Sequence, residues 1–544
     1  MALFQLRFLS LVGGAAVVAL VLTGASSLPV NANSPRAFGV PSQRAYPAGS
    51  RNAATRPRRD SGTPVSCTGG ATGHDAFVGG AGGNSAGGDN SGVLSGFGNE
   101  ACGEGAGIGT GGTIAAGNGE PCCGYNSAGG EDSFVAAGDL NFTYGFGSFI
   151  GSGGTIEATS LGITGQSETY GNIVYAEDAF VGAGDLNRIG SNGGGSFIGG
   201  GGFSYASTQT GGKYPVSAGN EIAAVDSFIG AGDLNVVDAN DSAVGGGQSN
   251  SIASPSPYSV IAGGYGNSIA SPAPYSAIAG GYENHNLAGS YAFVGAGDQN
   301  AMSGLDAFIG AGESNTVTTG GKYAAVAGGY ENQASDAYAT VGGGSGNSAS
   351  GQYGTIPGGS GNTAGGFLTF AAGYHADAKY SGSFVWSDYV SGSSTVSDTE
   401  KNEFVVRASG GVTLYSSEAA TSGVSLHAGS GTWSSLSDRN AKIDIVPLDD
   451  DSILAKVAAL PIDRWSYKSE QGVRHVGPMA QDFYAAFGTG EDDRHITSID
   501  EDGVALAAIK ALHRENTELR SRLATLEAQV AALASARTRP ETTF

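Results

Sequence analysis

The sequence predicts a mainly β protein: a parallel β-solenoid body followed by a C-terminal α+β unit that ends in a coiled coil. Two observations carry this prediction, a short repeat of fixed period and a heptad pattern near the C-terminus. The repeat is Ile or Val, two residues that are mostly Gly or Ala, then Gly, any two residues and Asn. Such a period indicates a stacked repeat architecture. Nine regular copies end at Asn235, Asn250, Asn267, Asn284, Asn300, Asn315, Asn332, Asn347 and Asn362.

Each repeat has a composition that favours strands over helices. The copies are 15 to 17 residues apart and too rich in Gly to hold a helix, whereas a β-branched anchor suits a short strand. The Gly three positions after the anchor can take positive φ at a corner. The Asn can do the same or can stack as a ladder between coils. About twenty coils between residues 71 and 374 predict a rod about 90–100 Å long.

The repeats also predict an association of identical chains. Only one Ile or Val per coil stands out as an anchor, which is too little for a private core, so we expect that face to pack against other copies. A monomeric solenoid with a thin interior is the alternative. The Gly-Asp corners superficially resemble calcium-binding repeats, but their period differs, so we expect no metal and no cofactor. Three tyrosines, interpreted as packing between coils or as a stacking strip, are Tyr265, Tyr282 and Tyr330.

These units resemble the head repeats of YadA-like trimeric autotransporter adhesins. Weaker copies that end at Asn99, Asn141 and Asn187 extend the resemblance over residues 71–380. It implies a left-handed parallel β-roll in a homotrimer. That family ends in a membrane-anchoring segment of about four strands per chain, and we expect no such segment in this chain.

The segments before the repeats indicate export. Residues 1–32 have the pattern of a signal peptide with cleavage after Ala32 or Ala25, and an uncleaved anchor is the alternative. We expect no other transmembrane anchor. Residues 33–70, rich in Pro, Ser and Arg, predict a flexible linker. Export permits disulfides, with three possible connectivities. The four cysteines are Cys67, Cys102, Cys122 and Cys123.

The net charge of the chain limits the classes of partner that it can bind. The formal net charge is −23, which argues against nucleic acid and anionic lipid because both would be repelled. Solubility of a long surface is the simpler explanation of this charge. A host cell, an extracellular matrix or a glycan surface stays possible as a partner.

After the repeats, residues 381–432 are expected to form a β connector that caps the solenoid, and residues 433–508 a second domain. Two motifs carry a second resemblance there. The segment from Ser437 to Lys442 resembles the start of the intramolecular chaperone of endosialidase-type phage tailspikes (serine peptidase family 74). The segment from Arg474 to Gln481 resembles the second signature of that family, and Trp465 and Tyr467 fit its intervening strand.

This resemblance implies homotrimeric assembly followed by self-cleavage at the serine. A Ser hydroxyl needs a base, and Lys442 can supply one if desolvation lowers its pKa. Ser437 reaches the carbonyl of Leu436 through a five-membered ring, which predicts cleavage of the Leu436–Ser437 bond. In the family, residues that match His475, Gly477 and Gln481 support processing. Here His475 is expected to polarise or orient the carbonyl and Gln481 to donate to the oxyanion. Alternatively, Ser437 caps a helix and Lys442 is a solvated charge.

Residues 509–537 carry a heptad seam, and residues 538–544 are expected to be a disordered tail. An Asn at an a position is commoner in dimers, so the trimer rests on the two resemblances. The seam comprises Ile509, Leu512, Asn516, Leu519, Leu523, Leu526, Val530 and Leu533.

The sequence therefore predicts a secreted or surface-displayed trimeric adhesin-like fibre with a self-cleaving C-terminal chaperone. A phage-type tail fibre that recognises a glycan is the second hypothesis, and a glycan-degrading tailspike enzyme is the third. Against the enzyme, the repeats show no pair of carboxylates that stands out from the Gly-Asp corners.

Overall fold

The computed structural model describes residues 70–80, 82–112, 114–115, 122–123, 125–154, 171–202, 219–392 and 394–537. The predicted signal peptide, nearly all of the linker, Cys67 and the C-terminal tail lie outside the described residues. Cys102 is disulfide-bonded. In the part of the chain that is described, no helix has the length and apolarity needed to cross a bilayer.

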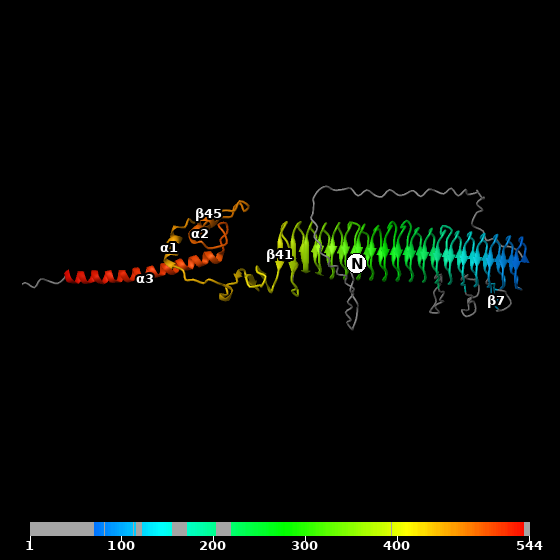
Figure 1. Ribbon diagram of the computed structural model, residues 1–544, viewed down its shortest axis with the longest axis horizontal. Helices are drawn as coiled ribbons and strands as arrows, with labels where there is room; N and C mark the ends of the chain where they lie inside the picture. Colours follow the sequence, from blue (N-terminus) through cyan, green and yellow to red (C-terminus); the bar gives the residue numbers. More distant parts are fainter. Residues whose placement is uncertain are drawn as a thin grey trace, which may run out of the picture. The chain divides into compact units, whose positions relative to one another are not determined.

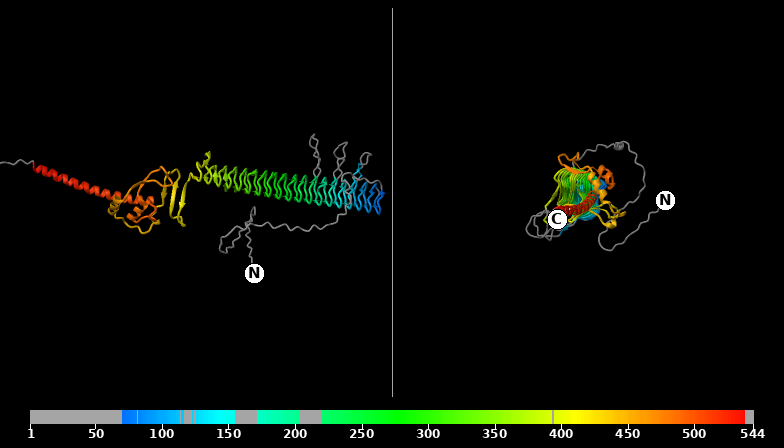
Figure 2. Two further views of the ribbon diagram at one scale, coloured as in Figure 1. Left: turned by 90° about the horizontal axis from the view of Figure 1, so that it is seen from above. Right: turned by 90° about the vertical axis from the view of Figure 1, so that its left-hand side faces the viewer.

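The body is a parallel β-solenoid, which confirms the prediction of a mainly β protein with a solenoid body (Figure 1). Each coil contributes one short strand to each of two parallel sheets, and the coils superimpose when viewed end-on (Figure 2). Sheet A has 19 strands, close to the twenty coils expected. Its strands are β1 (Gly70–Ala71), β3 (Ser85–Ala86), β5 (Glu100–Ala101), β9 (Ser127–Ala128), β11 (Phe142–Thr143), β13 (Ile173–Val174), β15 (Arg188–Ile189), β17 (Glu221–Ile222), β19 (Val236–Val237), β21 (Ser251–Ile252), β23 (Ser268–Ile269), β25 (His285–Asn286), β27 (Ala301–Met302), β29 (Thr316–Val317), β31 (Gln333–Ala334), β33 (Ser348–Ala349), β36 (Thr363–Ala364), β38 (Ala376–Ala378) and β40 (Val396–Ser397).

Sheet B is the second sheet and runs alongside sheet A in the same coils. Its strands are β2 (Phe77–Val78), β4 (Gly92–Val93), β6 (Gly107–Ile108), β10 (Phe134–Val135), β12 (Phe149–Ile150), β14 (Phe180–Val181), β16 (Phe197–Ile198), β18 (Phe228–Ile229), β20 (Ala243–Val244), β22 (Val260–Ile261), β24 (Ala277–Ile278), β26 (Phe293–Val294), β28 (Phe308–Ile309), β30 (Ala325–Val326), β32 (Thr340–Val341), β34 (Thr355–Ile356), β35 (Gly359–Ser360), β37 (Phe370–Tyr374), β39 (Phe384–Ser387) and β41 (Phe404–Arg407).

The interior of the solenoid is filled by one chain, contrary to the expectation of a single anchor per coil. Each coil turns two strand residues inward, one from each sheet; in one coil these are Ile229 and Val237, both fully buried. The second inward residue comes two positions after the Asn of the motif, where the repeat pattern does not mark it. Burying an aliphatic side chain contributes about 2 kcal/mol, so two per coil make a continuous core. The core therefore gives no evidence for or against a trimer.

The asparagines of the motif form a buried ladder, one of the two roles predicted for them. The amide and the Nδ2 of Asn267 both donate to Oδ1 of Asn250, at 3.1 and 3.0 Å. The same Nδ2 donates to the carbonyls of Gly263 and Gly281, both at 3.0 Å. The ladder satisfies corner groups that are out of reach of water, because each Asn is fully buried.

Positive φ is found at two other places in the same corner. Gly232, three positions after its anchor, has φ +101°, and a Cβ there would lie 1.9 Å from the carbonyl oxygen of Gly247. Glycine is therefore required at this position, as predicted. The second residue with positive φ is the one before the Asn, such as Leu234, and not the Asn itself.

Three insertions interrupt the repeat at this same corner. Residues 113–124, 155–170 and 203–218 separate the corner glycines from an Asn of the ladder and lie largely outside the described residues. Within the first insertion, β7 (Ile114–Ala115) pairs antiparallel with β8 (Cys122–Cys123). The insertions hide from the repeat pattern three members of the ladder: Asn126, Asn172 and Asn220.

An Asp in the following coil binds the chain just before each insertion. The amides of Gly112, Gly154 and Gly202 donate to Oδ1 of an Asp at 2.8, 2.7 and 3.0 Å. These acceptors are Asp139, Asp185 and Asp233 of the recurring GDLN corners. The described residues include no group of carboxylates, His or Cys that could hold a metal ion. The Gly-Asp corners thus have a structural role at the insertions.

The solenoid continues beyond residue 380, where its end was expected. Strands β37, β39 and β41 stay in parallel register although Asn362 is the last Asn of the ladder and Gly373, in β37, the last corner glycine. Longer strands replace the missing ladder, and ionic contacts fix the last coil. Arg407 Nε donates to the Asp388 carboxylate at 2.9 Å, and the amide of Ser409 donates to the same group at 2.7 Å.

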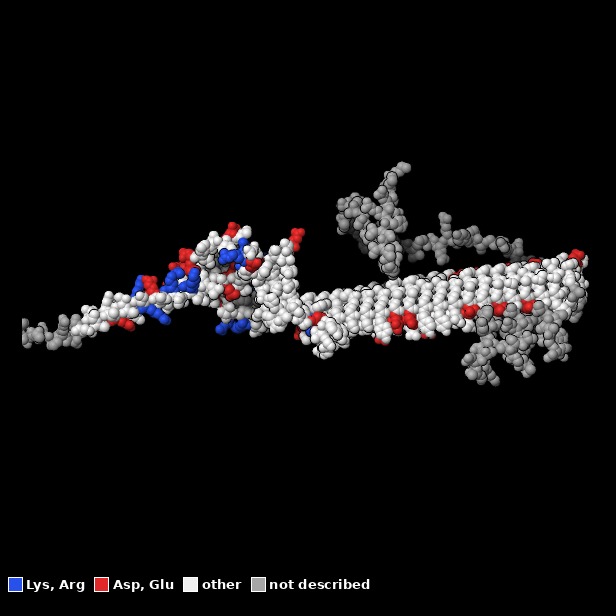
Figure 3. Space-filling view, turned by 90° about the horizontal axis from the view of Figure 1, so that it is seen from below, with Lys and Arg blue, Asp and Glu red and all other residues white. Residues whose placement is uncertain are grey.

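The C-terminal unit follows as a small α+β structure. Its antiparallel sheet contains β42 (Gly411–Tyr415), β43 (Gly423–His427) and β44 (Trp433–Ser435). Beyond it lie the 3₁₀ turn η1 (Arg439–Ala441), α1 (Asp450–Ala459), the hairpin of β45 (Asp463–Trp465) and β46 (His475–Gly477), α2 (Ala480–Phe487) and α3 (Ser498–Arg537). Figure 3 shows, on one face, charges of both signs on this unit and separate acidic spots on a largely uncharged solenoid.

Candidate functional site

The predicted scissile bond lies where the antiparallel sheet ends. Strand β44 pairs with β43, and the amide of Leu436 still donates to the carbonyl of Gly423 at 3.2 Å. The next residue, Ser437, has left the sheet. The acyl side of the Leu436–Ser437 bond is therefore held by a sheet, and the nucleophile begins a separate turn.

That turn brings Ser437 and Lys442 together. Lys442 Nζ donates to Ser437 Oγ at 2.6 Å. The intervening η1 turn is capped by Asp438, whose carboxylate accepts from the amide of Asn440 at 2.9 Å and from its Nδ2 at 3.1 Å. The amide of Lys442 closes the turn on the carbonyl of Arg439 at 3.2 Å. The residue that caps the turn is Asp438, and Ser437 is instead paired with the lysine.

The same contact can serve acyl chemistry once the lysine is neutral. An ammonium donates to the hydroxyl, whereas a free amine accepts the hydroxyl proton and makes Oγ a nucleophile. A lysine loses its proton more readily when it is shielded from water. Ser437 and Lys442 are both exposed in the single chain. The chain supplies the geometry of the pair but not the shielding.

The second motif builds a separate aromatic cluster around His475. Its ring stacks on Trp465, with centroids 4.8 Å apart and planes at 30°, and meets Tyr467 edge-on at 5.6 Å. His475 Nε2 lies 3.3 Å from a carboxylate oxygen of Glu470. The hairpin register explains the stacking, because Trp465 pairs directly with His475 across β45 and β46.

Gly477 and Gln481 lie beside this cluster. Gly477 faces the indole of Trp465, whose Nε1 is buried and has no hydrogen-bond partner among the described residues; a Cβ at Gly477 would lie 3.9 Å from that nitrogen. Gln481 lies in the first turn of α2 and is exposed. No hydrogen bond or ion pair of the described residues joins His475 or Gln481 to Ser437. The structure thus brings together the Ser–Lys pair, but not the three supporting residues with it.

Helix α3 carries the predicted seam and leaves it uncovered. Its buried residues lie on another face, which packs against α1 and includes Ala507, Ala508 and Ala511. Ion pairs fix this docking: Lys510 Nζ lies 2.9 Å from the Asp450 carboxylate, and Arg514 contacts Asp450 and Asp451.

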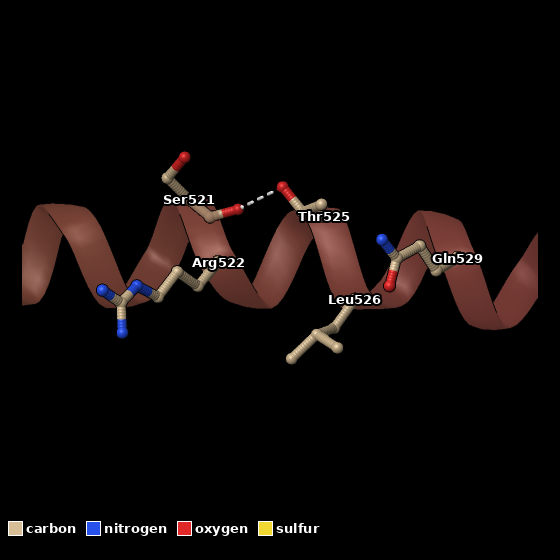
Figure 4. A pocket seen from close by; sticks show the side chains of 5 residues that line it. All are labelled: Ser521, Arg522, Thr525, Leu526 and Gln529. Atoms are coloured by element: carbon tan, nitrogen blue, oxygen red, sulfur yellow. Dashed lines mark hydrogen bonds between the residues drawn. The ribbon is translucent and has the colours of Figure 1, made fainter.

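The seven aliphatic residues of the seam are 48% to 71% exposed. Figure 4 shows Leu526 projecting from the helix beside Arg522, and the hollow there is lined by α3 alone. Asn516 Nδ2 donates to the carbonyl of Leu512 at 2.9 Å within the helix. Helix α3 is thus a 40-residue helix that leaves its aliphatic seam exposed.

Comparison with known families identifies the segment that contains both motifs. Residues 437–489 match the family model Peptidase_S74, chaperone of endosialidase. The match begins at Ser437 and includes the His475 cluster and the α2 helix. The solenoid body and this Peptidase_S74 segment fit the organisation of a tail fibre that carries an intramolecular chaperone. A comparison with curated proteins gives no match.

Two residues of this segment, Asp438 and Glu470, have roles that were not predicted from the sequence. Asp438 caps the η1 turn, and its signal is an Asp followed two residues later by Asn, which is typical of a capped turn. Glu470 contacts His475 across a turn, and no pattern marks it because its partner depends on the hairpin register.

Proposed function

We propose that the C-terminal unit is an intramolecular chaperone that assembles three chains into a fibre and then cuts itself off at Leu436–Ser437. The observation that carries this proposal is the 2.6 Å contact between Ser437 and Lys442 at the first residue of the Peptidase_S74 segment. The antiparallel sheet on one side of the bond and the capped turn on the other supply the positioning that an acyl transfer needs.

The proposed cleavage is a shift of the acyl group from the nitrogen to Oγ of Ser437, followed by hydrolysis of the resulting ester. The neutral amine of Lys442 takes the Oγ proton of Ser437, and Oγ attacks the carbonyl carbon of Leu436. The C–N bond then breaks, the nitrogen of Ser437 gains a proton, and an ester links Leu436 to Oγ. Water hydrolyses this ester to a carboxyl group at Leu436 and restores the Ser437 hydroxyl. His475 and Gln481 are proposed to polarise the carbonyl and stabilise the oxyanion, with Gly477 leaving room beside them.

Assembly is proposed to complete the site. The Ser–Lys pair is exposed and the His475 cluster is not bonded to it, so a lone chain lacks both shielding and oxyanion donors. The exposed seam of α3 offers the contact through which copies would associate. Cleavage that waits for association releases the chaperone only after the chains are aligned. Alignment matters because parallel coils with a repeated sequence can pair out of register.

The released body is proposed to be an exported, adhesin-like fibre that binds a host cell, matrix or glycan surface through many weak contacts. The resemblance of its repeats to YadA-like heads and the predicted signal peptide support this role. The alternative is a phage-type tail fibre or tailspike that binds or degrades a glycan, which the Peptidase_S74 match favours. Loss of surface binding on deletion of whole coils would support the adhesin, and hydrolysis of a polysaccharide by the body would support the tailspike.

Substitutions in the seam test the coupling of assembly to cleavage. In the full chain, Leu519→Asp with Leu526→Asp should give a monomer by light scattering and a single uncut mass, because buried charges cannot pack in a seam. The matched control is Ser521→Asp with Ala528→Asp, on the same helix but outside the seam, which should stay trimeric and be cut. Efficient cleavage of the monomeric seam variant would refute the coupling.

A further inference from the structure

One side of the solenoid carries an aromatic stripe that continues from coil to coil. From β10 to β41 the outward residue of the strand is Phe in ten coils of sheet B, and in six coils a Tyr lies two positions before the outward strand residue; one coil, with Tyr291 and Phe293, has both. We define the stripe as Phe134, Phe149, Phe180, Phe197, Phe228, Tyr258, Tyr275, Tyr291, Phe293, Phe308, Tyr323, Tyr338, Tyr353, Phe370, Phe384 and Phe404.

The aromatic residue changes position between coils but is rarely lost. Where the strand begins with Phe, as at Phe180, the corner residue two positions earlier is most often Asp or Gly, here Asp178. Where the corner holds Tyr, as at Tyr275, the strand begins with Ala, Thr or Val, here Ala277, except at Phe293, which follows Tyr291. The stripe has a gap at Ala243. At least one aromatic ring in nearly every coil is therefore a property of this side as a whole.

The tyrosines occupy a backbone conformation that they do not favour. All six have φ between 54° and 61°, at a corner where other coils place Asp, Asn or Gly. Positive φ is costly for a bulky residue. Asp or Gly would make the same corner at lower cost, so the corner itself does not explain the tyrosines. Their outward rings do, because in five of the six coils they keep the stripe aromatic where the strand residue is not aromatic.

The stacking of aromatic rings between coils limits which class of ligand can bind over the stripe. Phe180 and Phe197 stack with centroids 4.8 Å apart and planes at 2°, and Tyr275 and Tyr291 stack at 4.9 Å and 4°. Ring faces are thus used by neighbouring rings, and ring edges are left outward. A sugar or a base stacks on a free ring face, which these rows do not offer. Apolar side chains can pack against ring edges.

The extent and polarity of the stripe match a protein interface. None of the outward strand residues of sheet B from Phe134 to Phe404 is charged, whereas those of sheet A include Arg188, Glu221 and Asp377. At about 4.8 Å per coil and about 3.3 Å per residue, a stripe about 70 Å long and 10 Å wide covers about 700 Å². That exceeds the apolar patch of a typical monomer and approaches the roughly 800 Å² that each partner contributes to a stable interface.

We infer that the stripe is the face through which the solenoid bodies of identical chains pack against one another. The inference rests on the proposed trimer and assigns its body interface to sheet B. A second copy is the occupant that fits, because the α3 seam is another exposed apolar surface on the same chain. Parallel pairing of identical helices also places equivalent coils at equivalent heights. The acidic corners, such as Asp178 and Asp226, then form a solvated rim.

Cross-linking of the full-length chain tests this assignment. Ala243→Cys places a thiol on the outer face of sheet B, in the gap of the stripe; Ser251→Cys places one on the outer face of sheet A, on the next strand. Both positions are partly exposed, and the unsubstituted chain controls for the native cysteines. With mild oxidation or a short bismaleimide, we expect a band at twice the mass of the cleaved body for Ala243→Cys only. A disulfide requires Cα atoms about 4.4–6.8 Å apart, so it reports direct apposition.

Light scattering on the same samples distinguishes a failure of the stripe inference from a failure of the proposed trimer. An oligomer in which Ala243→Cys does not cross-link, or in which Ser251→Cys cross-links equally, would overturn the stripe inference and leave the proposed function standing. A monomer would overturn both, and the stripe would then belong to a foreign partner.

Discussion

Lys442 Nζ and Ser437 Oγ are 2.6 Å apart because the 3₁₀ turn between them folds the chain back on itself. Asp438 caps that turn through two bonds to Asn440, so a side chain outside the reacting pair sets the distance within it. The sheet that ends at Leu436 fixes the other partner of the reaction. The pair is thus built locally, and its shielding is proposed to come from assembly.

Loss of the Asp438 cap should slow cleavage without preventing assembly. Asp438→Ala frees the turn, and we expect the first-order cleavage rate to fall about five-fold, in line with the usual effect of losing a cap. Time-resolved mass spectrometry of freshly purified chain measures the rate, and light scattering checks the trimer. Arg439→Ala, in the same turn but without a side-chain hydrogen bond, is the control and should be cut at the normal rate. Equal rates for the two variants would show that the cap is irrelevant.

The Asn ladder should be the most sensitive part of the solenoid. Asn267→Ala removes donors to Asn250, Gly263 and Gly281 and leaves buried groups unpaired, which should cost about 3 kcal/mol. Amide exchange in the adjoining coils should then accelerate by about 100-fold. Asn192→Ala, at an exposed turn, should change exchange little. Comparable exchange in both variants would mean that the ladder contributes little to stability.

The last coil should be weakened by acid. The hydroxyl and amide of Ser409, with Arg407, hold the pKa of Asp388 below its ordinary value. A carboxyl with a depressed pKa stabilises the fold above its unfolded pKa of about 3.9, and that stability is lost as the pH falls through the folded value. The urea midpoint of Trp386 fluorescence, in a chain with Trp433→Phe and Trp465→Phe, should therefore fall between pH 6 and pH 3.

Asp388→Asn provides the matched comparison for this pH effect. The amide cannot titrate, so its midpoint should be lower at pH 6 and should change less between the two pH values. A pH dependence as steep as that of the parent chain would assign the effect to other groups.

Much of the solenoid could be predicted because its repeat encodes a local geometry. The Gly that must have positive φ and the Asn that must be buried are fixed by the corner, so both recur in sequence. The second core residue of each coil, such as Val237, was missed because Ile, Val, Met and Ala all fill that place. Asn172 and Asn220 were missed because insertions separate them from their anchors, although the coil geometry resumes after each insertion.

The candidate site also has a part that the sequence can indicate and a part that it cannot. The contact between Ser437 and Lys442 follows from a five-residue spacing and a local turn, which sequence can indicate. The partners of His475 depend on the register of a hairpin, and the exposure of the seam depends on which face α1 covers. Those are tertiary relationships, and the contacts between chains that would complete the site lie beyond a single chain.

The central claim is self-cleavage at Ser437, and intact-mass spectrometry of the purified full chain tests it most directly. The account predicts one large fragment that ends at Leu436 and one that begins at Ser437. Ser437→Ala and Lys442→Ala should each give a single uncut chain that is still trimeric by light scattering. Cleavage that persists at this bond in Ser437→Ala, or an uncut parent chain in a trimer, would contradict the account.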